Sequence, residues 1–298
     1  MSAVIDWGVW LDAPAKINLF LHVTGRRSDG YHLLQTAFRF LDHGDRLRLH
    51  PRTDAQVRRA NAIEGVPEQD DLCVRAARLL QAEAPGPYGV DIELDKRLPM
   101  GGGLGGGSSD AATVLIALNM LWGLDLTRER LQSIALQLGA DVPVFVFGRA
   151  AFAEGVGEAL QALDVPPAAY LVVAPGVSVP TQRIFAAPEL TRNTEPCKIA
   201  DFAAAARKNV LFGRNDLQAV AELYYPEVAE AVALLSALVE ARFPGQAQVR
   251  MSGSGACVFV QCVCIEHAQA MLDAASARWP ADWTGFVAQG MDGHPLYR

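Results

Sequence analysis

A run of glycines ending in two serines is the strongest chemical feature of the sequence. Residues 99–109 read PMGGGLGGGSS, and the residues that follow, DAATVLIALNML, are typical of a helix. Glycine leaves the backbone N–H groups uncovered, and the first turn of a helix carries a partial positive charge. With the hydroxyls of Ser108 and Ser109 added, this segment predicts a cradle for phosphate groups. A flexible linker is disfavoured, because the segment lies between an alternating strand pattern and a helix.

Two other phosphate motifs fit this glycine loop poorly. Gly101, Gly103 and Gly106 match the GxGxxG spacing of dinucleotide-binding oxidoreductases. That motif needs an acidic residue at the end of the next strand, about 20 residues on, and Asp125 has this spacing but lies between two predicted helices. No Gly-Lys-Ser/Thr follows the glycines, which excludes a Walker A loop.

A second loop of small residues, MSGSGA at 251–256, precedes a predicted strand. It is either a tight turn or part of a binding site. Its spacing is not GxSxG, so a hydrolase nucleophile is not supported.

Asp141 is a candidate general base. It stands immediately before Val142-Pro143, where an aspartate often caps a helix with proline in the first turn. Both roles are compatible, because a helix N-terminus keeps a carboxylate ionised. Taken singly, Lys16 would be an exposed strand lysine, and Tyr31 and His32 would be surface residues of a turn.

The hydrophobic pattern gives the elements that must position these groups. An alternating strand covers 13–23, with Lys16, Asn18, Phe20 and His22 on a partly polar face, and a turn at 24–32 leads to a second strand. Further strands are predicted at 90–95, from 170, at 257–264 and near 286, and helices at 72–80, from Ser108–Asp110 to about 123, at 127–138, 216–224 and 228–241. This order predicts an α+β protein of two domains, with a boundary at Val165-Pro166-Pro167.

Composition narrows the class of protein. The chain has 298 residues and a formal net charge of −7, which disfavours broad nucleic-acid binding. No apolar stretch has the ~18 residues of a membrane helix, and the first residues do not resemble a signal peptide, so a cytoplasmic protein is expected. Five cysteines without a CxxC pair suit a reducing compartment. A metal site at Cys262, Cys264 and His267 is disfavoured, because the two cysteines fall in a buried strand pattern and a closed metal site normally needs a fourth ligand at suitable spacing.

Three separated segments together resemble one family. APAKINLFL at 13–21, PMGGGLGGGSSDAATVLIALN at 99–119 and RMSGSGACVF at 250–259 resemble, in order and spacing, the three motifs of the GHMP kinases. Residues 16–38, 138–158 and 175–194 are similar to the branch of that family that acts on 4-diphosphocytidyl-2-C-methyl-D-erythritol. The DGYH turn and the GADVPVF segment argue against the alternative, a homoserine or mevalonate type of GHMP kinase.

The resemblance implies an activity and a fold. The activity is ATP-dependent phosphorylation of the C2 hydroxyl of 4-diphosphocytidyl-2-C-methyl-D-erythritol, in the non-mevalonate route to isoprenoid precursors, with ATP and Mg²⁺ as cofactors. The fold is a ribosomal protein S5 domain 2-like ATP-binding domain over 1–165 and a ferredoxin-like domain over 166–298, with the substrate in the cleft between them. A small-molecule partner, no nucleic acid, no membrane and a monomer or homodimer are expected. A non-catalytic ATP-binding regulator is disfavoured because Lys16 and Asp141 are both present.

The resemblance also assigns residues. It implies Lys16 and Asp141 as catalytic residues, and Asn18, Tyr31, His32 and Phe185 as substrate-binding residues, with Phe185 against cytosine. The ATP phosphate loop would comprise Pro99, Met100, Gly101, Gly102, Gly103, Leu104, Gly105, Gly106, Gly107, Ser108 and Ser109. Two departures from related sequences bear on this site. Asp71 stands where asparagine is frequent near the adenine, and Asp110 is expected to add negative charge near the triphosphate.

Overall fold

Two long antiparallel strands form the centre of the molecule. The computed structural model describes residues 5–208, 210–242, 244 and 248–297. Strand β1 (Leu11–Arg26) pairs with β2 (His32–Arg52) from Leu11 opposite Leu47 to Arg26 opposite His32. The turn between them contains Gly30 at a φ of +92°, a conformation that favours glycine.

One face of β1 is partly polar, as predicted, but the expectation that Lys16 is exposed is wrong. Lys16 and Asn18 are each 2% exposed, and His22 is 7% exposed. Loops from distant parts of the sequence cover this face, so the strand is buried on both sides. A buried lysine must have hydrogen-bond acceptors around it, which sets the chemistry of the site described below.

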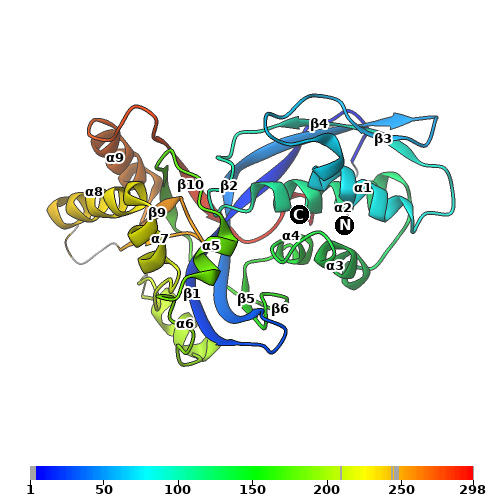
Figure 1. Cartoon of the computed structure of the whole chain (residues 1–298). Coiled ribbons are helices and arrows are strands. Elements are labelled where there is room, and N and C mark those ends of the chain that lie inside the picture. The colour runs from blue at the N-terminus through cyan, green and yellow to red at the C-terminus, as the bar shows by residue number, and fades with distance from the viewer. Residues whose placement is uncertain (1–4, 209, 243, 245–247, 298) are drawn as a thin grey trace.

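The strands form one continuous sheet that runs through the whole molecule (Figure 1). Its order is β3 (Val57–Arg59), β4 (Gly89–Asp95), β2, β10 (Thr284–Met291), β7 (Ala169–Ala174), β9 (Val258–Cys262) and β8 (Val249–Met251). Strands β1 and β5 (Ala151–Glu154) also pair with β2, and β6 (Ala159–Ala162) pairs with β5. The sheet crosses the predicted boundary at 165/166, and that division stays a prediction.

Two groups of helices cover the two ends of the sheet (Figure 1). One group packs around β2 and β4 and consists of α1 (Leu72–Gln81), α2 (Gly106–Leu121), α3 (Arg128–Leu136) and α4 (Val142–Phe147). The other packs around β7, β8 and β9 and consists of α7 (Gln218–Tyr224), α8 (Pro226–Arg242) and α9 (Ile265–Ser276). Helices α5 (Thr181–Ala186) and α6 (Ile199–Ala206), with the short turns Glu68–Asp70 and Pro295–Tyr297, complete the elements. No helix in the described part of the chain is long and apolar enough to span a membrane.

Most predicted elements are confirmed, with several boundaries displaced by two or three residues. Helix α2 begins at Gly106, two residues before the predicted start, because Gly105 adopts the left-handed conformation at the N-cap. The strand predicted at 257–264 ends at Cys262, and α9 begins at Ile265. The described residues hold no cluster of three or more histidines, cysteines or acidic residues suited to a metal ion.

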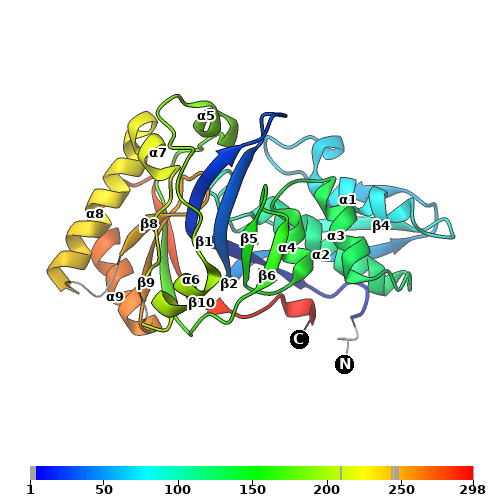
Figure 2. The same ribbon diagram turned by 90° about the horizontal axis from the view of Figure 1, so that it is seen from below.

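The C-terminal segment returns to the first group of helices (Figure 2). Leu296 lies in the core formed by α1–α4, and His294 is completely buried. The His294 Nδ1 atom accepts a hydrogen bond from the Leu296 N–H at 3.3 Å, and Nε2 lies 3.1 Å from the Thr113 hydroxyl. Because the Thr113 hydroxyl donates to the Ser109 carbonyl at 2.8 Å, His294 Nε2 must donate to Thr113. With Nδ1 accepting and Nε2 donating, the imidazole is neutral.

This burial makes the stability of the protein pH-dependent. Burial lowers the pKa of His294 to about 3. The unfolded chain therefore binds a proton below its ordinary histidine pKa, about 6.5, that the folded chain does not bind, and stability falls as the pH falls. We expect His294→Gln to be less stable than the parent at pH 7.5, and that difference in the free energy of unfolding to shrink by about 1.4 kcal/mol at pH 5.5. Urea unfolding at both pH values measures it, and a constant difference would contradict a neutral buried His294.

Candidate functional site

Two hollows lie on either side of the glycine loop. The larger, about 770 Å³, is lined by residues of β1, β2, α5 and the loop at 253–255. The smaller, about 400 Å³, lies between the glycine loop and the start of α1. Gly101, Gly103 and Ser108 line both hollows. Two ligands bound in these hollows would therefore meet at the glycine loop.

The glycine loop depends on glycine for its conformation and its packing. Gly101, Gly103 and Gly105 have φ values of +67°, +75° and +71°. A Cβ at Gly103 would lie 2.1 Å from the Ser252 carbonyl oxygen of the second small-residue loop. All residues from Pro99 to Ser108 line the smaller hollow. Ser109, which was also predicted to bind phosphate, is fully buried and lines neither hollow.

The Lys16 side chain lines the larger hollow and contacts Gly103, which lines both hollows. Its Nζ atom donates to the Asn18 Oδ1 atom at 2.7 Å and to the Gly103 carbonyl at 3.0 Å, and it lies 3.2 Å from the Asp141 Oδ2 atom. An ammonium group has three N–H donors, so the three acceptors use all of them. Lys16 thus joins β1, the glycine loop and the start of α4 in one fixed arrangement.

Asp141 occupies the N-cap position of α4, but its side chain makes no capping hydrogen bond. The carboxylate is 42% exposed and pairs with Lys16, and it lines the larger hollow. The interpretation of Asp141 as an ordinary capping side chain is therefore wrong, because the buried ammonium attracts the carboxylate into the cleft. One of its oxygens is available to a ligand while the other faces Lys16.

Further polar residues, which the sequence did not single out, hold Asn18 and the second loop. The Asn18 Nδ2 atom donates to the Thr36 hydroxyl at 2.9 Å, and the Asn18 N–H donates to the Ser252 hydroxyl at 3.3 Å. The Asn215 Nδ2 atom donates to the carbonyls of Met251 and Gly253 at 2.8 and 2.7 Å. Thr36 could have been found as a polar residue within an apolar strand, whereas Asn215 carries no local signal.

The far end of the larger hollow is aromatic. Tyr31 is 66% exposed, and the rings of His32 and Phe185 lie with their centroids 4.9 Å apart. All three line the hollow. Burial, with the nearby charges of Arg192 and Arg26, lowers the pKa of His32, so this histidine is neutral at pH 7. The structure thus brings every predicted substrate-binding residue to the same cleft as Lys16 and Asp141.

Asp110 does not add a free negative charge beside the glycine loop. It is 2% exposed, and its carboxylate lies 2.6 Å from the Lys96 ammonium, which also contacts Asp45. Burial raises the pKa of Asp110 to about 7. The Asp45 carboxylate in turn accepts the N–H groups of Arg97 and Leu98 at 2.6 and 2.8 Å. The negative charge expected of Asp110 is therefore compensated by Lys96. Together, Asp45, Lys96 and Asp110 connect the residues that precede the glycine loop to α2.

Asp71, near the expected adenine position, is also engaged. Its carboxylate caps α1 by accepting the N–H groups of Cys73 and Val74 at 2.7 and 3.4 Å, and it lies 2.9 Å from the Arg59 guanidinium. It lines the smaller hollow together with Leu72. Asp71 therefore lines the smaller hollow with its negative charge already paired with Arg59.

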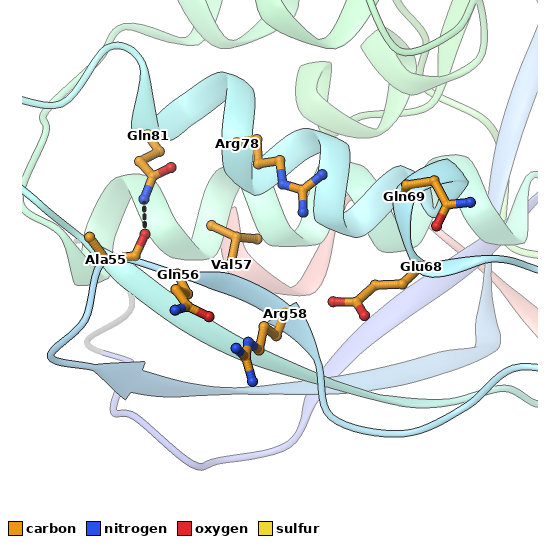
Figure 3. A pocket seen from close by; sticks show the side chains of 8 residues that line it. All are labelled: Ala55, Gln56, Val57, Arg58, Glu68, Gln69, Arg78 and Gln81. Atoms are coloured by element: carbon orange, nitrogen blue, oxygen red, sulfur yellow. Dashed lines mark hydrogen bonds between the residues drawn. The ribbon is translucent and has the colours of Figure 1, made fainter.

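A third hollow, of about 420 Å³, lies between β3 and α1 (Figure 3). Eight residues line it, and none of them is a predicted site residue: Ala55, Gln56, Val57, Arg58, Glu68, Gln69, Arg78 and Gln81. No residue of the glycine loop lines it, and the predicted site residues lie in the other two hollows.

Comparison with known proteins gives a consistent result. Residues 71–149 match the model of the GHMP kinases N-terminal domain. A 4-diphosphocytidyl-2-C-methyl-D-erythritol kinase of Thiobacillus denitrificans is 57% identical over 285 residues, which are 96% of this chain and 96% of that protein. A protein of the same name from an Azoarcus species is 56% identical over 96% of this chain and 95% of its own length.

Solved structures show the same fold. A crystal structure of a 4-(cytidine 5'-diphospho)-2C-methyl-D-erythritol kinase matches with a TM-score of 0.81 and 35% identity, over 96% of this chain and all of that one. A homoserine kinase from Cytophaga hutchinsonii matches with a TM-score of 0.63 and 17% identity, over 99% of this chain and 98% of that chain. The second match is a likeness of fold alone.

The glycine loop and the loop at 251–256 lie so close together that replacing Gly103 and replacing Gly107 should affect stability very differently. Gly103→Ala would put a Cβ against the Ser252 carbonyl at a positive φ, and we expect it to lower the free energy of unfolding by roughly 2–4 kcal/mol. Gly107→Ala, whose nearest contact would be Leu72 Cδ1 at 3.7 Å, is the matched control and should leave stability unchanged or slightly higher. Urea unfolding compares them, and equal midpoints would contradict the observed loop packing.

Proposed function

Because the chain belongs to the 4-diphosphocytidyl-2-C-methyl-D-erythritol kinases, a branch of the GHMP kinases, we propose that it transfers the terminal phosphoryl group of ATP to the C2 hydroxyl of that alcohol. This reaction supplies the non-mevalonate route to isoprenoid precursors. The observation that carries the proposal is the Lys16–Asp141 pair, which lines the larger hollow beside the glycine loop that borders both hollows. An acceptor alcohol on one side of the loop and a nucleotide on the other would meet at this pair.

ATP is the phosphoryl donor, and the smaller hollow is the site proposed for it. The backbone N–H groups of the glycine loop and the first turn of α2 would hold its phosphates. Ser108 borders both hollows, so its hydroxyl would lie near the terminal phosphate. The adenine would lie beside Leu72 and the start of α1, which line the same hollow.

Mg²⁺ fits this arrangement as a partner of the phosphates. Magnesium usually keeps several waters and takes only one or two protein oxygens together with substrate phosphates, so no closed cage of acidic side chains is needed. The Ser108 hydroxyl, which borders both hollows, is an oxygen of the required kind. The ion would offset the charge of the β- and γ-phosphates as the phosphoryl group is transferred.

Asp141 would act as the general base. Phosphoryl transfer to an alcohol has a loose transition state, so positioning and charge stabilisation contribute most of the catalysis. The free oxygen of the Asp141 carboxylate would accept the proton of the C2 hydroxyl as the new bond forms. Lys16, fixed by Asn18 and the Gly103 carbonyl, would orient that carboxylate and stabilise the developing negative charge.

The aromatic end of the larger hollow would bind the cytidine. Tyr31 and Phe185 present ring faces on which a base can stack, and His32 contributes a polar ring beside them. Binding energy from this remote group can be used to align a crowded tertiary hydroxyl with the phosphate. Asn18, close to Lys16, would contact the erythritol portion.

We also propose the division into an S5 domain 2-like domain over 1–165 and a ferredoxin-like domain over 166–298. Two of the three hydrophobic cores formed by the described residues support it, one around α1–α4 and one around α7–α9, while the third packs residues of both parts together, among them Phe20 and Tyr170. The larger hollow is lined from both sides of the boundary, by Lys16 and Asp141 on one side and by Phe185 and Ser254 on the other. A cleft between domains is a common place for a small-molecule site.

The base assignment predicts the effect of one amide substitution. Asp141→Asn keeps the shape of the side chain but removes the proton acceptor, so we expect kcat to fall by about 10²–10⁴. The Kd for ATP should remain nearly unchanged because Asp141 does not line the smaller hollow. Steady-state ADP release measures turnover, with Asp273→Asn, an exposed residue of α9, as the control. Near-normal kcat in the Asp141 variant would remove it from this role.

Lys16 should act on turnover more than on binding. Lys16→Met removes the charge from a buried position, and we expect kcat to fall by roughly 10²–10³, the range for the loss of one electrostatic stabiliser. Lys208→Met, at an exposed lysine after α6, is the matched control. If only the KM for the alcohol rose, Lys16 would be a binding residue instead. Circular dichroism spectra of both variants test whether the fold is retained.

The acceptor is tested by a panel of alcohols. Purified protein with Mg-ATP is given 4-diphosphocytidyl-2-C-methyl-D-erythritol, mevalonate, homoserine or no acceptor, and ADP release is followed. Turnover with the cytidyl alcohol alone is expected. Turnover only with mevalonate or homoserine would keep the fold assignment and overturn the substrate, and ATP binding without turnover would indicate a regulator.

A further inference from the structure

Arg192 lies behind the aromatic end of the larger hollow and does not line it. Its guanidinium donates to the carbonyls of Leu190 at 3.0 Å, Phe185 at 3.0 Å and Ala187 at 2.6 Å. These carbonyls belong to the end of α5 and the residues after it, so one side chain holds the segment that carries Phe185. The same guanidinium also reaches β2, 160 residues earlier in the chain.

The contact with β2 fixes the protonation of His32. The Arg192 Nε–H group donates to the His32 Nε2 atom at 3.1 Å. A guanidinium has no acceptor, so Nε2 must carry a lone pair and the ring proton of the neutral histidine must lie on Nδ1. His32 is therefore presented to the hollow as a ring with a donating Nδ1–H group. Cytosine carries hydrogen-bond acceptors at O2 and N3, which suit such a donor.

The charges around His32 favour the same state. Burial and the charges of Arg192 and Arg26 disfavour a second proton on the ring and lower the pKa of His32. The nearest acidic residue of the turn, Asp29, is engaged by the Arg27 guanidinium at 2.8 Å and by the Tyr31 N–H at 3.2 Å. The ring thus lies among cations and apolar surface, with its centroid 4.9 Å from that of Phe185.

We propose that Arg192 is the positioning residue of the base-binding end: it fixes His32 as a neutral donor and sets the spacing of the His32 and Phe185 rings. This inference deepens the proposed function and rests on it, since it concerns how the cytidine of the substrate is recognised. Arg192 does not touch the reacting atoms, so its loss should weaken binding of the cytidyl substrate and leave phosphoryl transfer intact.

Three variants test the role of Arg192. Arg192→Met removes all four hydrogen bonds, and Arg192→Lys keeps the charge without the forked geometry. Arg183→Met is the matched control, because Arg183 lies on α5, the helix that carries Phe185, but its guanidinium donates to the Tyr225 hydroxyl at 3.2 Å and does not line the hollow. We expect the KM for the cytidyl substrate to rise about tenfold in Arg192→Met, the equivalent of one charge-assisted hydrogen bond, and less in Arg192→Lys. The kcat, the KM for ATP and the Arg183→Met kinetics should stay near parental values.

The histidine state gives a readout that does not depend on activity. Nitrogen-15 NMR of histidine-labelled protein, with His32 assigned by the His32→Gln variant, reports which ring nitrogen carries the proton. In the parent we expect a neutral ring protonated on Nδ1 at pH 7 and above. In Arg192→Met we expect mixed tautomers and protonation nearer the ordinary histidine pKa, about 6.5, so that KM for the substrate becomes pH-dependent below pH 7.

The outcomes separate this inference from the proposed function. A proton on Nε2 in the parent, or an unchanged KM in Arg192→Met, would overturn it. A fall in kcat and a rise in the KM for ATP together would show a general structural role and also overturn it. If Arg192→Met does not fold, the KM of Arg192→Lys and the tautomer of His32 in the parent still test the role of Arg192. An inactive parent enzyme with the predicted tautomer would instead count against the proposed function.

Discussion

The site depends on one buried ammonium group. Lys16 is 2% exposed and must find acceptors for its three N–H groups, because an unpaired charge inside a protein is strongly unfavourable. Those acceptors are Asn18 on the same strand, the Gly103 carbonyl and the Asp141 carboxylate. Each comes from a different structural unit, so satisfying Lys16 fixes the strand, the glycine loop and the start of α4 relative to one another. The position of the Asp141 carboxylate in the cleft follows from that requirement.

The continuous sheet carries this arrangement to the rest of the molecule. Strands β1 and β2 pair over most of their length, and β10 returns to pair with β2 at Leu41 and Phe40. The final residues then enter the first helical core, where His294 is hydrogen-bonded to Thr113 in the helix that follows the glycine loop. Helix α2, which follows the glycine loop, is therefore held by residues far away in the sequence. On one side of the cleft, Lys16 holds the glycine loop and Asp141 together, while Arg192 holds the aromatic end.

Local patterns predicted what depends on local chemistry. The glycine loop and the strand and helix alternation could be found by spacing. Asp71 and Thr127, which cap α1 and α3, are residue types common at the start of a helix. The burial of Lys16 could not be found in this way, since the loops that cover it are roughly 90 and 240 residues away in the chain. The ion pair between Asp110 and Lys96, which follows β4, could not be predicted from the sequence either. Nor could the contact of Arg192 with His32, which lies 160 residues earlier in the chain. Short strands such as β5 and β6 carry too few residues for a periodic signal. Long-range polar contacts of this kind leave no pattern in a single sequence.

The central claim is that an alcohol and a nucleotide meet across the glycine loop at the Asp141 carboxylate. The most direct measurement is a crystal structure with a non-hydrolysable ATP analogue, Mg²⁺ and 4-diphosphocytidyl-2-C-methyl-D-erythritol. The account predicts the triphosphate on the glycine loop, the cytosine between Tyr31 and Phe185, and the C2 hydroxyl within hydrogen-bond distance of Asp141 and in line with the γ-phosphate. A substrate bound with its C2 hydroxyl away from Asp141, or a nucleotide outside the smaller hollow, would contradict it.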